Sequence, residues 1–335
     1  MNQVKGMRGL HPFSICFLVA GFLTSANSNE LSESNIRKIR RACVEIRVDG
    51  QLRGGGAFVK DENGKTFVIT AAHLFPNPKS VCSVLTSDDT AHFGSLVAYD
   101  LGHDLALIDV DNISRFGALS IAPEIPTETK PIFNFGPALR RRTLAVPGKV
   151  ADSRISYTDF SSSGGYLANY FVGGINPTLT SGGIWVDEYG QIVGIQHGRL
   201  IGDKSPSSGI SLVSPPTAIR ALLKSKNSAQ TPCLGGFVWE VWTADHDSLA
   251  RLPRDLQGLI VKQVFADRAL DRAGLKVEDV IVKCNGVAIK RRHHLLDLIR
   301  DKPLGTEFTL EFYRPSKRRY FSAKLVTDAL ETFWH

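Results

Sequence analysis

Short runs of alternating hydrophobic and polar residues fill the chain from Cys43 to about Val213. These runs are rich in β-branched residues and are separated by turn residues, with hairpin signals such as "DENGK" and "DEYGQ". Alternation with a period of two, broken by such turns, is typical of antiparallel strands. No long amphipathic helix interrupts the series, so the pattern predicts an antiparallel β-sandwich or barrel.

The pattern changes after residue 213. "SPPTAIRALLKSK" has prolines in its first turn and hydrophobic residues at helical spacing, and it predicts a helix capped by Ser214. The polar stretch 227–232 that follows has the composition of a linker. Beyond it, strand runs mixed with two short helical segments and a closing hairpin predict a small α/β domain.

The N-terminus has the features of an export signal. Lys5 and Arg8 precede a mostly apolar run of 11 residues, 13–23, and small residues follow in "TSANSN". We expect a signal peptide over residues 1–26, with cleavage after Ala26 or Ser28. An uncleaved membrane anchor is the alternative, although the run is shorter than the roughly 20 residues that span a bilayer.

The chain has a net charge of +7, and its basic clusters are short: 37–41, 140–142 and 290–294. They lack interleaved aromatic residues and any nucleic-acid motif, so we expect solvated surface and no nucleic-acid partner. Attraction to anionic membranes or acidic substrate tails is the functional alternative. His293 and His294 are adjacent and do not share a helix face, so neither a metal site nor a cofactor is predicted.

Five cysteines occur in the chain, and Cys16 lies within the predicted export signal. The other four show no C-x-x-C spacing, which argues against zinc or redox chemistry. In an oxidising compartment the pairs that respect the domain boundary are Cys43–Cys82 and Cys233–Cys284. Buried free thiols are the alternative.

His73 and Asp104 are candidates for acid–base chemistry. His73 ends the strand run "VITAAH", so its ring is expected to project into a cleft. Asp104 immediately precedes the apolar strand in "GHDLALIDV", where a buried carboxylate needs a partner. A histidine Nδ1–H would supply one, although a simple strand-start turn residue is the alternative.

With a Ser-Gly-Gly after these residues, the sequence resembles trypsin-like serine proteases of the HtrA type. "TAAH", "DLALI" and "INPTLTSGGIWVDEYGQIVGI" resemble the family's histidine, aspartate and serine motifs. "FNFGPALRRRTLAVPGKV" and "SSGISLVSPPTAIRALL" resemble segments that open the second barrel and close the domain. The resemblance covers about Cys43 to Leu223, and it implies a mainly β fold: a chymotrypsin-like double antiparallel β-barrel over residues 36–225.

The resemblance also assigns roles by position. Ser181 attacks the scissile carbonyl, His73 is the general base, and Asp104 orients the imidazole. Ser163, in the other Ser-Gly-Gly, lacks the following hairpin and is expected to lie in a flexible loop. The expected walls of the specificity pocket, with residues 175–178 leading in, are Gln196, His197, Gly198, Gly209, Ile210 and Ser211. They include no carboxylate, so a small or medium apolar side chain is expected there.

Leu179 is a departure from the family. The oxyanion hole should be formed by the backbone N–H groups of Leu179 and Ser181, and the family has glycine at the position of Leu179. A positive φ costs a leucine about 1–2 kcal/mol, so the peptide could rest with its N–H turned away. The loop is also one residue longer than the family motif. An active or activatable site is expected, and a degenerate protease is the alternative.

Residues 233–328 resemble a PDZ domain of the HtrA type, after a linker at 226–232. "CLGGFVWEV" resembles the carboxylate-binding loop and the strand after it, and "EDVIVKCNG" a later segment of the domain. Backbone N–H groups of Leu234, Gly235, Gly236 and Phe237 would bind a peptide C-terminus while the strand accepts the peptide. The helix "HHLLDLIR" would line the groove, and the basic residues 290–292 favour acidic peptides. A spacer that binds nothing tightly is the alternative.

The sequence thus predicts an exported serine endopeptidase that acts through an acyl-enzyme. The resemblance further implies a periplasmic location in a bacterium and cleavage of unfolded or damaged proteins. Residues 31–42 form an amphipathic segment that family analogy places in a homotrimer contact. The first rival function is a catalytically silent chaperone or peptide-binding scaffold. The second is a signalling protease that a peptide activates at the PDZ domain.

Overall fold

The structure is a computed structural model that describes residues 30–138, 141–160, 164–175, 180–201 and 208–331. The chain from Leu31 onward forms one compact unit. The predicted export signal, Ser163 and Leu179 lie outside the described residues, so the statements made about them above stay predictions.

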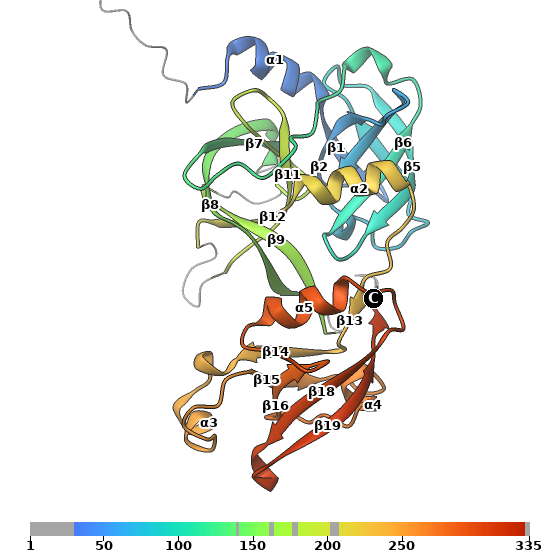
Figure 1. Cartoon of the computed structure of the whole chain (residues 1–335). Helices are drawn as coiled ribbons and strands as arrows, with labels where there is room; N and C mark the ends of the chain where they lie inside the picture. Colours follow the sequence, from blue (N-terminus) through green and yellow to red (C-terminus); the bar gives the residue numbers. More distant parts are fainter. Residues whose placement is uncertain (1–29, 139–140, 161–163, 176–179, 202–207, 332–335) are drawn as a thin grey trace, which may run out of the picture. The chain divides into compact units, whose positions relative to one another are not determined.

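Two closed antiparallel barrels make up the first part of the chain (Figure 1). The strand order is β1-β2-β3-β6-β5-β4 in the first barrel and β10-β11-β12-β9-β8-β7 in the second. The first barrel contains β1 (Cys43–Val48), β2 (Gln51–Lys60), β3 (Thr66–Thr70), β4 (Cys82–Leu85), β5 (Ala91–Asp100) and β6 (Leu105–Val110). The second contains β7 (Pro131–Ala138), β8 (Arg141–Phe160), β9 (Gly165–Gly174), β10 (Ile184–Val186), β11 (Ile192–Arg199) and β12 (Ile210–Ser214).

One α-helix precedes the strands of the two barrels in the sequence, and another follows them. Helix α1 (Glu33–Ala42) begins after Ser32, whose Oγ accepts a hydrogen bond from the N–H of Asn35 at 3.1 Å. Its Ile39 is fully buried, so α1 packs on its own chain. Two single-turn 3-10 helices, η1 (Ala72–Leu74) and η2 (Ser114–Phe116), lie within the first barrel segment.

Helix α2 (Pro216–Ser225) follows β12 as predicted, but its cap differs from the prediction. The N-cap is Pro215 and no side chain caps the helix. Ser214 is instead the last residue of β12, where it pairs with Ile195. Because the strand continues to Ser214, its hydroxyl points elsewhere and donates to the carbonyl of His103 at 2.6 Å.

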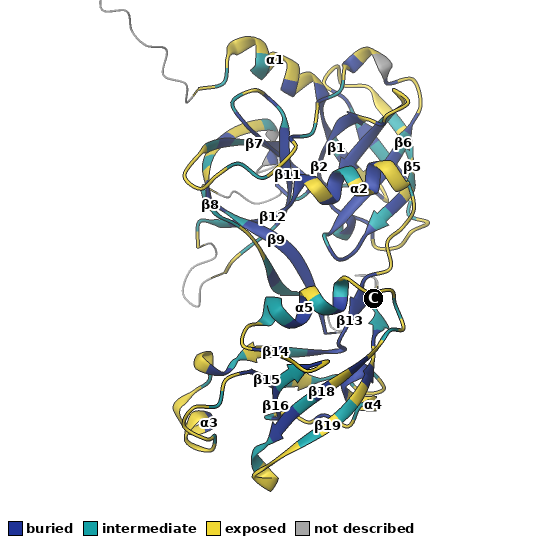
Figure 2. Cartoon of the chain, in the orientation of Figure 1, coloured by how far each residue is buried: buried dark blue, intermediate teal, exposed yellow. Residues whose placement is uncertain are grey.

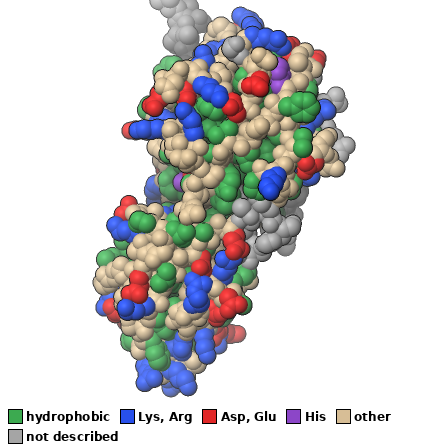
Figure 3. Space-filling view, turned by 90° about the vertical axis from the view of Figure 1, so that its right-hand side faces the viewer, with side chains coloured by type: hydrophobic (Ala, Val, Ile, Leu, Met, Phe, Trp, Pro, Cys, Tyr) green, Lys and Arg blue, Asp and Glu red, His purple; other side chains and the backbone are tan. Residues whose placement is uncertain are grey.

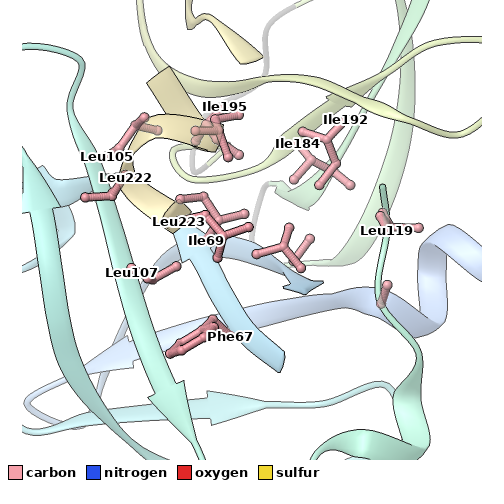
Figure 4. Close-up of a cluster of buried hydrophobic side chains, with 14 of the residues drawn as sticks. Phe67, Ile69, Leu105, Leu107, Leu119, Ile184, Ile192, Ile195, Leu222 and Leu223 are labelled. Atoms are coloured by element: carbon pink, nitrogen blue, oxygen red, sulfur yellow. The ribbon is translucent and has the colours of Figure 1, made fainter. Parts of the chain in front are cut away.

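The largest core of this part lies where strands of both barrels and helix α2 meet. Its side chains are drawn in Figure 4, and those labelled there are Phe67, Ile69, Leu105, Leu107, Leu119, Ile184, Ile192, Ile195, Leu222 and Leu223. All are buried, and Figure 2 shows the same dark interior along the strands. Burial of this apolar surface is the main force that holds the two barrels together.

The C-terminal part is a small α/β domain with the sheet order β14-β15-β16-β18-β19. Its strands are β13 (Pro232–Cys233), β14 (Gly236–Glu240), β15 (Leu259–Val264), β16 (Val280–Cys284), β17 (Val287–Ala288), β18 (Glu307–Arg314), β19 (Arg319–Val326) and β20 (Asp328–Ala329). Its helices are η3 (Val241–Thr243), α3 (His246–Ala250), α4 (Ala269–Arg272), α5 (Arg292–Arg300) and η4 (Pro315–Lys317). β14 is an edge strand of the sheet.

The predicted linker is fastened to the first barrel. The N–H of Ala229 donates to the carbonyl of Tyr99 at 2.8 Å, and the N–H of Tyr99 donates to Ser228 Oγ at 3.3 Å. At the end of the linker, β13 pairs with β20 near the C-terminus. Ser228 and Ala229 of the predicted linker therefore form hydrogen bonds with Tyr99 of β5.

The predicted disulfides are wrong, and the alternative of buried free thiols holds. Cys43, Cys82, Cys233 and Cys284 are all free and buried. Cys82 lies opposite Val48 in the β1–β4 ladder, which places it five residues, or roughly 16 Å, along β1 from Cys43. Cys233 packs with the first barrel and Cys284 packs in the core of the C-terminal domain. Burial raises the pKa of Cys43 to about 12.

The charged surface does not gather by sign on the face that Figure 3 presents, where Lys and Arg are largely interspersed with Asp and Glu. Among the described residues of the basic clusters, Arg37 pairs with Glu33 and Arg292 pairs with Asp159. No helix in the described part of the chain is long and apolar enough to cross a membrane.

Candidate active site

His73 and Asp104 form a hydrogen-bonded pair between the end of β3 and the start of β6. Asp104 Oδ2 lies 2.6 Å from His73 Nδ1, and Asp104 Oδ1 accepts the backbone N–H of His73 at 2.8 Å. The carboxylate is fully buried, whereas 26% of the imidazole side chain is exposed. The aspartate therefore fixes the ring from inside, and the open side of the ring is left for a reacting group.

The turn before Asp104 is held from several sides. Asp104 has a φ of 53°, a left-handed conformation that a non-glycine residue keeps only where the surroundings impose it. Its carbonyl accepts the N–H of Ala72 at 3.2 Å. His103 contributes two further anchors, because its Nδ1 lies 2.7 Å from Asp100 Oδ2 and its carbonyl accepts the hydroxyl of Ser214.

Burial disfavours a charged imidazolium at His73. The adjacent carboxylate of Asp104 more than offsets this through its charge and its hydrogen bond, and the net effect raises the pKa of His73. A base with a raised pKa holds an abstracted proton more firmly. The pair therefore has the properties of a general base with an orienting acid.

Ser181 lies in a tight turn that is fastened to both barrels. The N–H of Gly183 donates to the carbonyl of Thr180 at 2.9 Å, and the carbonyl of Ser181 accepts the N–H of Gly55 in β2 at 2.8 Å. Gly182 has a φ of 75°, and a Cβ there would collide with the Gly55 carbonyl and the Thr70 hydroxyl. The glycine after the serine is thus required by the fold.

The turn of Ser181 and the segment of His73 meet at one residue of β2. A Cβ at Gly54 would collide with the Ser181 carbonyl and would come within 2.9 Å of the Leu74 side chain, next to His73. Within the described residues, the Ser181 hydroxyl makes no hydrogen bond and His73 bonds only to Asp104. Catalytic hydrogen bonds are often long in unliganded sites and tighten with substrate. Leu179 lies outside the described residues, so the oxyanion-hole assignment stays a prediction.

The residues expected to form the specificity pocket lie on β11 and β12, which pair in antiparallel register, except for Gly209, which immediately precedes β12. The side chain of Gln196 is used within the fold, because it accepts from Trp185 Nε1 at 2.8 Å and donates to the carbonyl of Gly198 at 2.5 Å. Of the set, Gln196, His197 and Ser211 are buried, and Gly198, Gly209 and Ile210 are half-buried. Ile175 is exposed, and residues 176–178 lie outside the described residues.

His197 was expected as a pocket wall, but its buried position beside the His73–Asp104 pair was not indicated by the sequence. It is buried where the β11–β12 register shifts, and its Nε2 has no hydrogen-bond partner within the described part of the chain. Burial lowers the pKa of His197 to about 4, and the charges of Asp104 and His73 act on it in opposite directions. It is therefore neutral at neutral pH beside the His73–Asp104 pair.

The loop expected to bind a peptide carboxylate has the required backbone. Gly235 has a φ of 68°, and a Cβ there would collide with Arg268. The carbonyls of Leu234 and Gly235 turn inward, where they accept the N–H groups of Leu270 at 2.9 Å and Phe265 at 3.0 Å. β14 and α5 are in contact, and the peptide-binding groove between them stays a prediction.

The β8–β9 hairpin of the second barrel lies along this groove. The hydroxyl of Tyr166 accepts the N–H of Val238 in β14 at 2.6 Å. Asp159 accepts from Trp239 Nε1 at 3.0 Å, and a Cβ at Gly164 would collide with the backbone of Gly236. The edge strand that would receive a peptide is thus in contact with the chain's own hairpin.

No group of three or more His, Cys, Asp or Glu residues suited to a metal ion occurs among the described residues. Residues 54–195 match the family model of the trypsin-like peptidase domain, and residues 233–325 match that of the PDZ domain. Both matches agree with the fold described above and confirm the predicted fold class.

Relatives give the same result for the chain as a whole. Serine protease Do-like HtrA of Bacillus subtilis is 24% identical over an alignment covering 81% of this chain and 63% of that protein. The periplasmic serine endoprotease DegP of Escherichia coli is 25% identical, with coverage of 79% and 55%. A solved structure of the HtrA-type protease AlgW with a decapeptide has a TM-score of 0.62 at 15% identity, covering 89% of this chain and 99% of that one.

The chain thus spans less than two thirds of the length of the two relatives above. Its two matched domains and the shared fold nevertheless agree on one assignment. The chain contains a trypsin-like peptidase domain followed by a PDZ domain, and over most of its length it is similar to the HtrA and DegP serine proteases.

Proposed function

We propose that the protein is a serine endopeptidase in which Ser181, His73 and Asp104 form the catalytic triad. One observation carries the proposal. The His73–Asp104 pair, with Nδ1 and Oδ2 2.6 Å apart, and the turn of Ser181 both lie next to Gly54 of β2. A nucleophile, a base and an orienting acid brought to one place by three segments are the requirements of acyl transfer.

The proposed reaction has two halves. His73 Nε2 takes the proton of the Ser181 hydroxyl as Oγ attacks the scissile carbonyl, and the imidazolium then protonates the leaving amine. Water, deprotonated by the same nitrogen, hydrolyses the acyl-enzyme and regenerates the serine. Asp104 holds the tautomer that leaves Nε2 free, and the N–H groups of Ser181 and Leu179 are the proposed donors to the oxyanion.

Substrate binding is proposed at β11 and β12. The pocket set Gln196, His197, Gly198, Gly209, Ile210 and Ser211 offers no carboxylate for a basic side chain, so a small or medium apolar residue is the proposed preference. The internal hydrogen bonds of Gln196 support a structural part for that side chain, because both of its polar ends are satisfied within the fold.

The PDZ domain is proposed to bind peptide C-termini through the N–H groups of residues 234–237. The positive φ of Gly235 and the edge position of β14 support this, since both are needed for a carboxylate loop and an added strand. A solved structure of the HtrA-type protease AlgW contains a decapeptide, which supports peptide recognition by this type of protease. An incoming peptide would have to displace the β8–β9 hairpin from β14.

We place the protein outside the cytoplasm, in the periplasm of a bacterium, acting on unfolded or damaged proteins. The support is the predicted export signal at residues 1–26 and the names of relatives such as the periplasmic endoprotease DegP. The proposed domain limits are 36–225 for the peptidase and 233–328 for the PDZ domain. A homotrimer through residues 31–42 stays a prediction by family analogy.

Cleavage of an unfolded casein-like substrate tests the proposal. We expect Ser181→Ala to abolish cleavage, while the matched variant Ser163→Ala, in the other Ser-Gly-Gly, keeps it. Should the wild-type protein cleave nothing, with or without C-terminal peptides, the silent-scaffold alternative replaces the proposed enzyme. Cleavage that appears only on addition of a C-terminal peptide supports the signalling protease.

A further inference from the structure

Arg300, the last residue of helix α5, reaches from the PDZ domain into the peptidase domain. Its Nη1 donates to the carbonyl of Gly102 at 3.2 Å, and its Nη2 donates to the carbonyl of Tyr166. The guanidinium lies 4.8 Å from the centre of the Tyr157 ring, within the range of a cation–π contact. One side chain thus contacts the β8–β9 hairpin and the turn that leads to Asp104.

Arg300 is half-buried, and partial loss of hydration is costly for its guanidinium. Loss of hydration lowers the pKa of Arg300, while the charges of Tyr157, Asp100, Cys233 and Asp297 act in the opposite direction. Its Nε is buried and has no hydrogen-bond partner within the described residues. A solvated arginine at a domain surface would avoid this cost, so the burial calls for a specific role.

Gly102 is shaped to receive the arginine. A Cβ at Gly102 would come within 2.6 Å of Thr231 Oγ1 and within 3.3 Å of Arg300 Nη1. The same carbonyl also accepts the N–H of Ala168 in β9 at 2.8 Å. The carbonyl is therefore held from the second barrel and from the PDZ domain together, two residues before Asp104.

We propose that Arg300 is a positioning residue for Asp104, acting through the Gly102 carbonyl. Asp104 sits in a left-handed backbone conformation, which persists only where neighbouring contacts impose it. Removing a donor from the turn loosens the carboxylate that orients His73. This inference rests on the proposed triad and adds a link: the helix that lines the PDZ groove also holds the catalytic aspartate's turn.

Two other side chains of α5 contact the β8–β9 hairpin and, among the described residues, make no hydrogen bond to the turn before Asp104. Asp297 accepts the hydroxyl of Tyr157 at 2.6 Å, and Arg292 pairs with Asp159, so both bind the hairpin. Loss of either contact affects the docking of the hairpin. Loss of the Arg300 contact affects the turn as well, and this difference makes the proposal testable.

The test compares Arg300→Met and Arg300→Lys with Lys302→Met in the full chain, by steady-state kinetics against pH on one peptide substrate. Lys302 lies two residues further on, is exposed and pairs only with its neighbour Asp301 among the described residues. We expect Arg300→Met to lower kcat by roughly ten- to a hundredfold with little change in KM, because misplacement of a catalytic group acts on the chemical step.

A second readout separates positioning from a general loss of folded protein. A loosened Asp104 stabilises the protonated imidazole of His73 less, so the pKa of His73 is raised less than in the wild-type protein. The acid limb of kcat/KM therefore moves to lower pH in Arg300→Met. Lys302→Met keeps the wild-type profile. Arg300→Lys, which keeps the charge but reaches one carbonyl, falls between the two and serves as the test if Arg300→Met does not fold.

An unchanged kcat in a folded Arg300 variant would overturn the inference. A lower kcat with an unmoved acid limb would also overturn it, because that pattern indicates loss of active protein. Failure of the proposed triad is distinguishable from both, since in that case Ser181→Ala cleaves the same substrate as the wild-type protein does.

Discussion

Asp104 holds His73 by two hydrogen bonds, one to Nδ1 at 2.6 Å and one from the backbone N–H at 2.8 Å. The two oxygens of one buried carboxylate therefore fix both the ring and the chain that carries it. This double attachment ties the position of His73, the proposed general base, to the turn formed by residues 101–104.

The first prediction concerns this carboxylate. Asp104→Asn should lower kcat by roughly 10⁴, because an amide at this position favours the tautomer with its proton on Nε2. Steady-state kinetics on a peptide substrate measures the loss. Asp109→Asn is the control, because Asp109 pairs with Lys65 near the surface and lies on β6, the strand that begins directly after Asp104. Similar kcat values for the two variants would remove Asp104 from the catalytic group.

The second prediction follows from the raised pKa of His73. The base must be neutral to accept a proton, so the acid limb of kcat/KM should have its midpoint above the usual histidine value of about 6.5. Activity is lost as the pH falls through that midpoint. A pH profile of the wild-type protein checks this, and a midpoint below 6 is the result that the His73–Asp104 contact does not allow.

The third prediction concerns the glycine after the nucleophile. Gly182→Ala places a Cβ against the Gly55 carbonyl in a left-handed backbone, so it should destabilise the fold by about 1–3 kcal/mol and disorder the turn of Ser181. Gly173→Ala is the control, because its nearest neighbour is 3.8 Å away. Thermal unfolding and cleavage are measured together. Equal melting temperatures would mean that the turn tolerates a side chain.

The fourth prediction concerns the PDZ groove. Tyr166→Phe removes the hydroxyl that accepts the Val238 N–H, so an acidic C-terminal peptide should bind about fivefold more tightly. Fluorescence anisotropy of a labelled peptide measures the affinity, with Tyr320→Phe, an exposed tyrosine on β19, as control. If both variants bind as the wild-type protein does, the hairpin and the peptide do not compete.

The fifth prediction addresses Leu179. If a positive φ at this position disfavours the oxyanion hole, Leu179→Gly should raise kcat, by up to about 10²–10³ where the second donor is wholly absent at rest. Leu179→Ala is the control, because it shortens the side chain without freeing the backbone. Equal rates for the glycine variant and the wild-type protein would show that the longer loop already supplies the donor.

Much of the site could be predicted because its parts are local. "TAAH" and "DLALI" each place one polar residue at the end of an apolar strand, and a buried Asp104 needs a partner such as His73. The strand patterns, which persist over many residues, predicted an antiparallel sandwich or barrel and a small α/β domain, and the resemblance to HtrA-type proteases implied the double barrel and the PDZ domain. The matching family models confirm both folds.

Contacts between distant segments could not be predicted in the same way. The hydroxyl of Ser214 bonds to His103, 111 residues away, and its sequence context instead indicated a helix cap. The disulfide error has a similar origin, because cysteine spacing says nothing about the strand register that puts Cys82 opposite Val48. Arg300 lies in a separate domain, so only the packed structure brings it to Gly102.

The identity of the nucleophile is tested most directly by reacting the protein with a fluorophosphonate probe and mapping the modified peptide by mass spectrometry. We expect one adduct, on Ser181, that is absent from Ser181→Ala and forms more slowly in Asp104→Asn. An adduct on Ser163, or no adduct in the presence of substrate or C-terminal peptides, would contradict it.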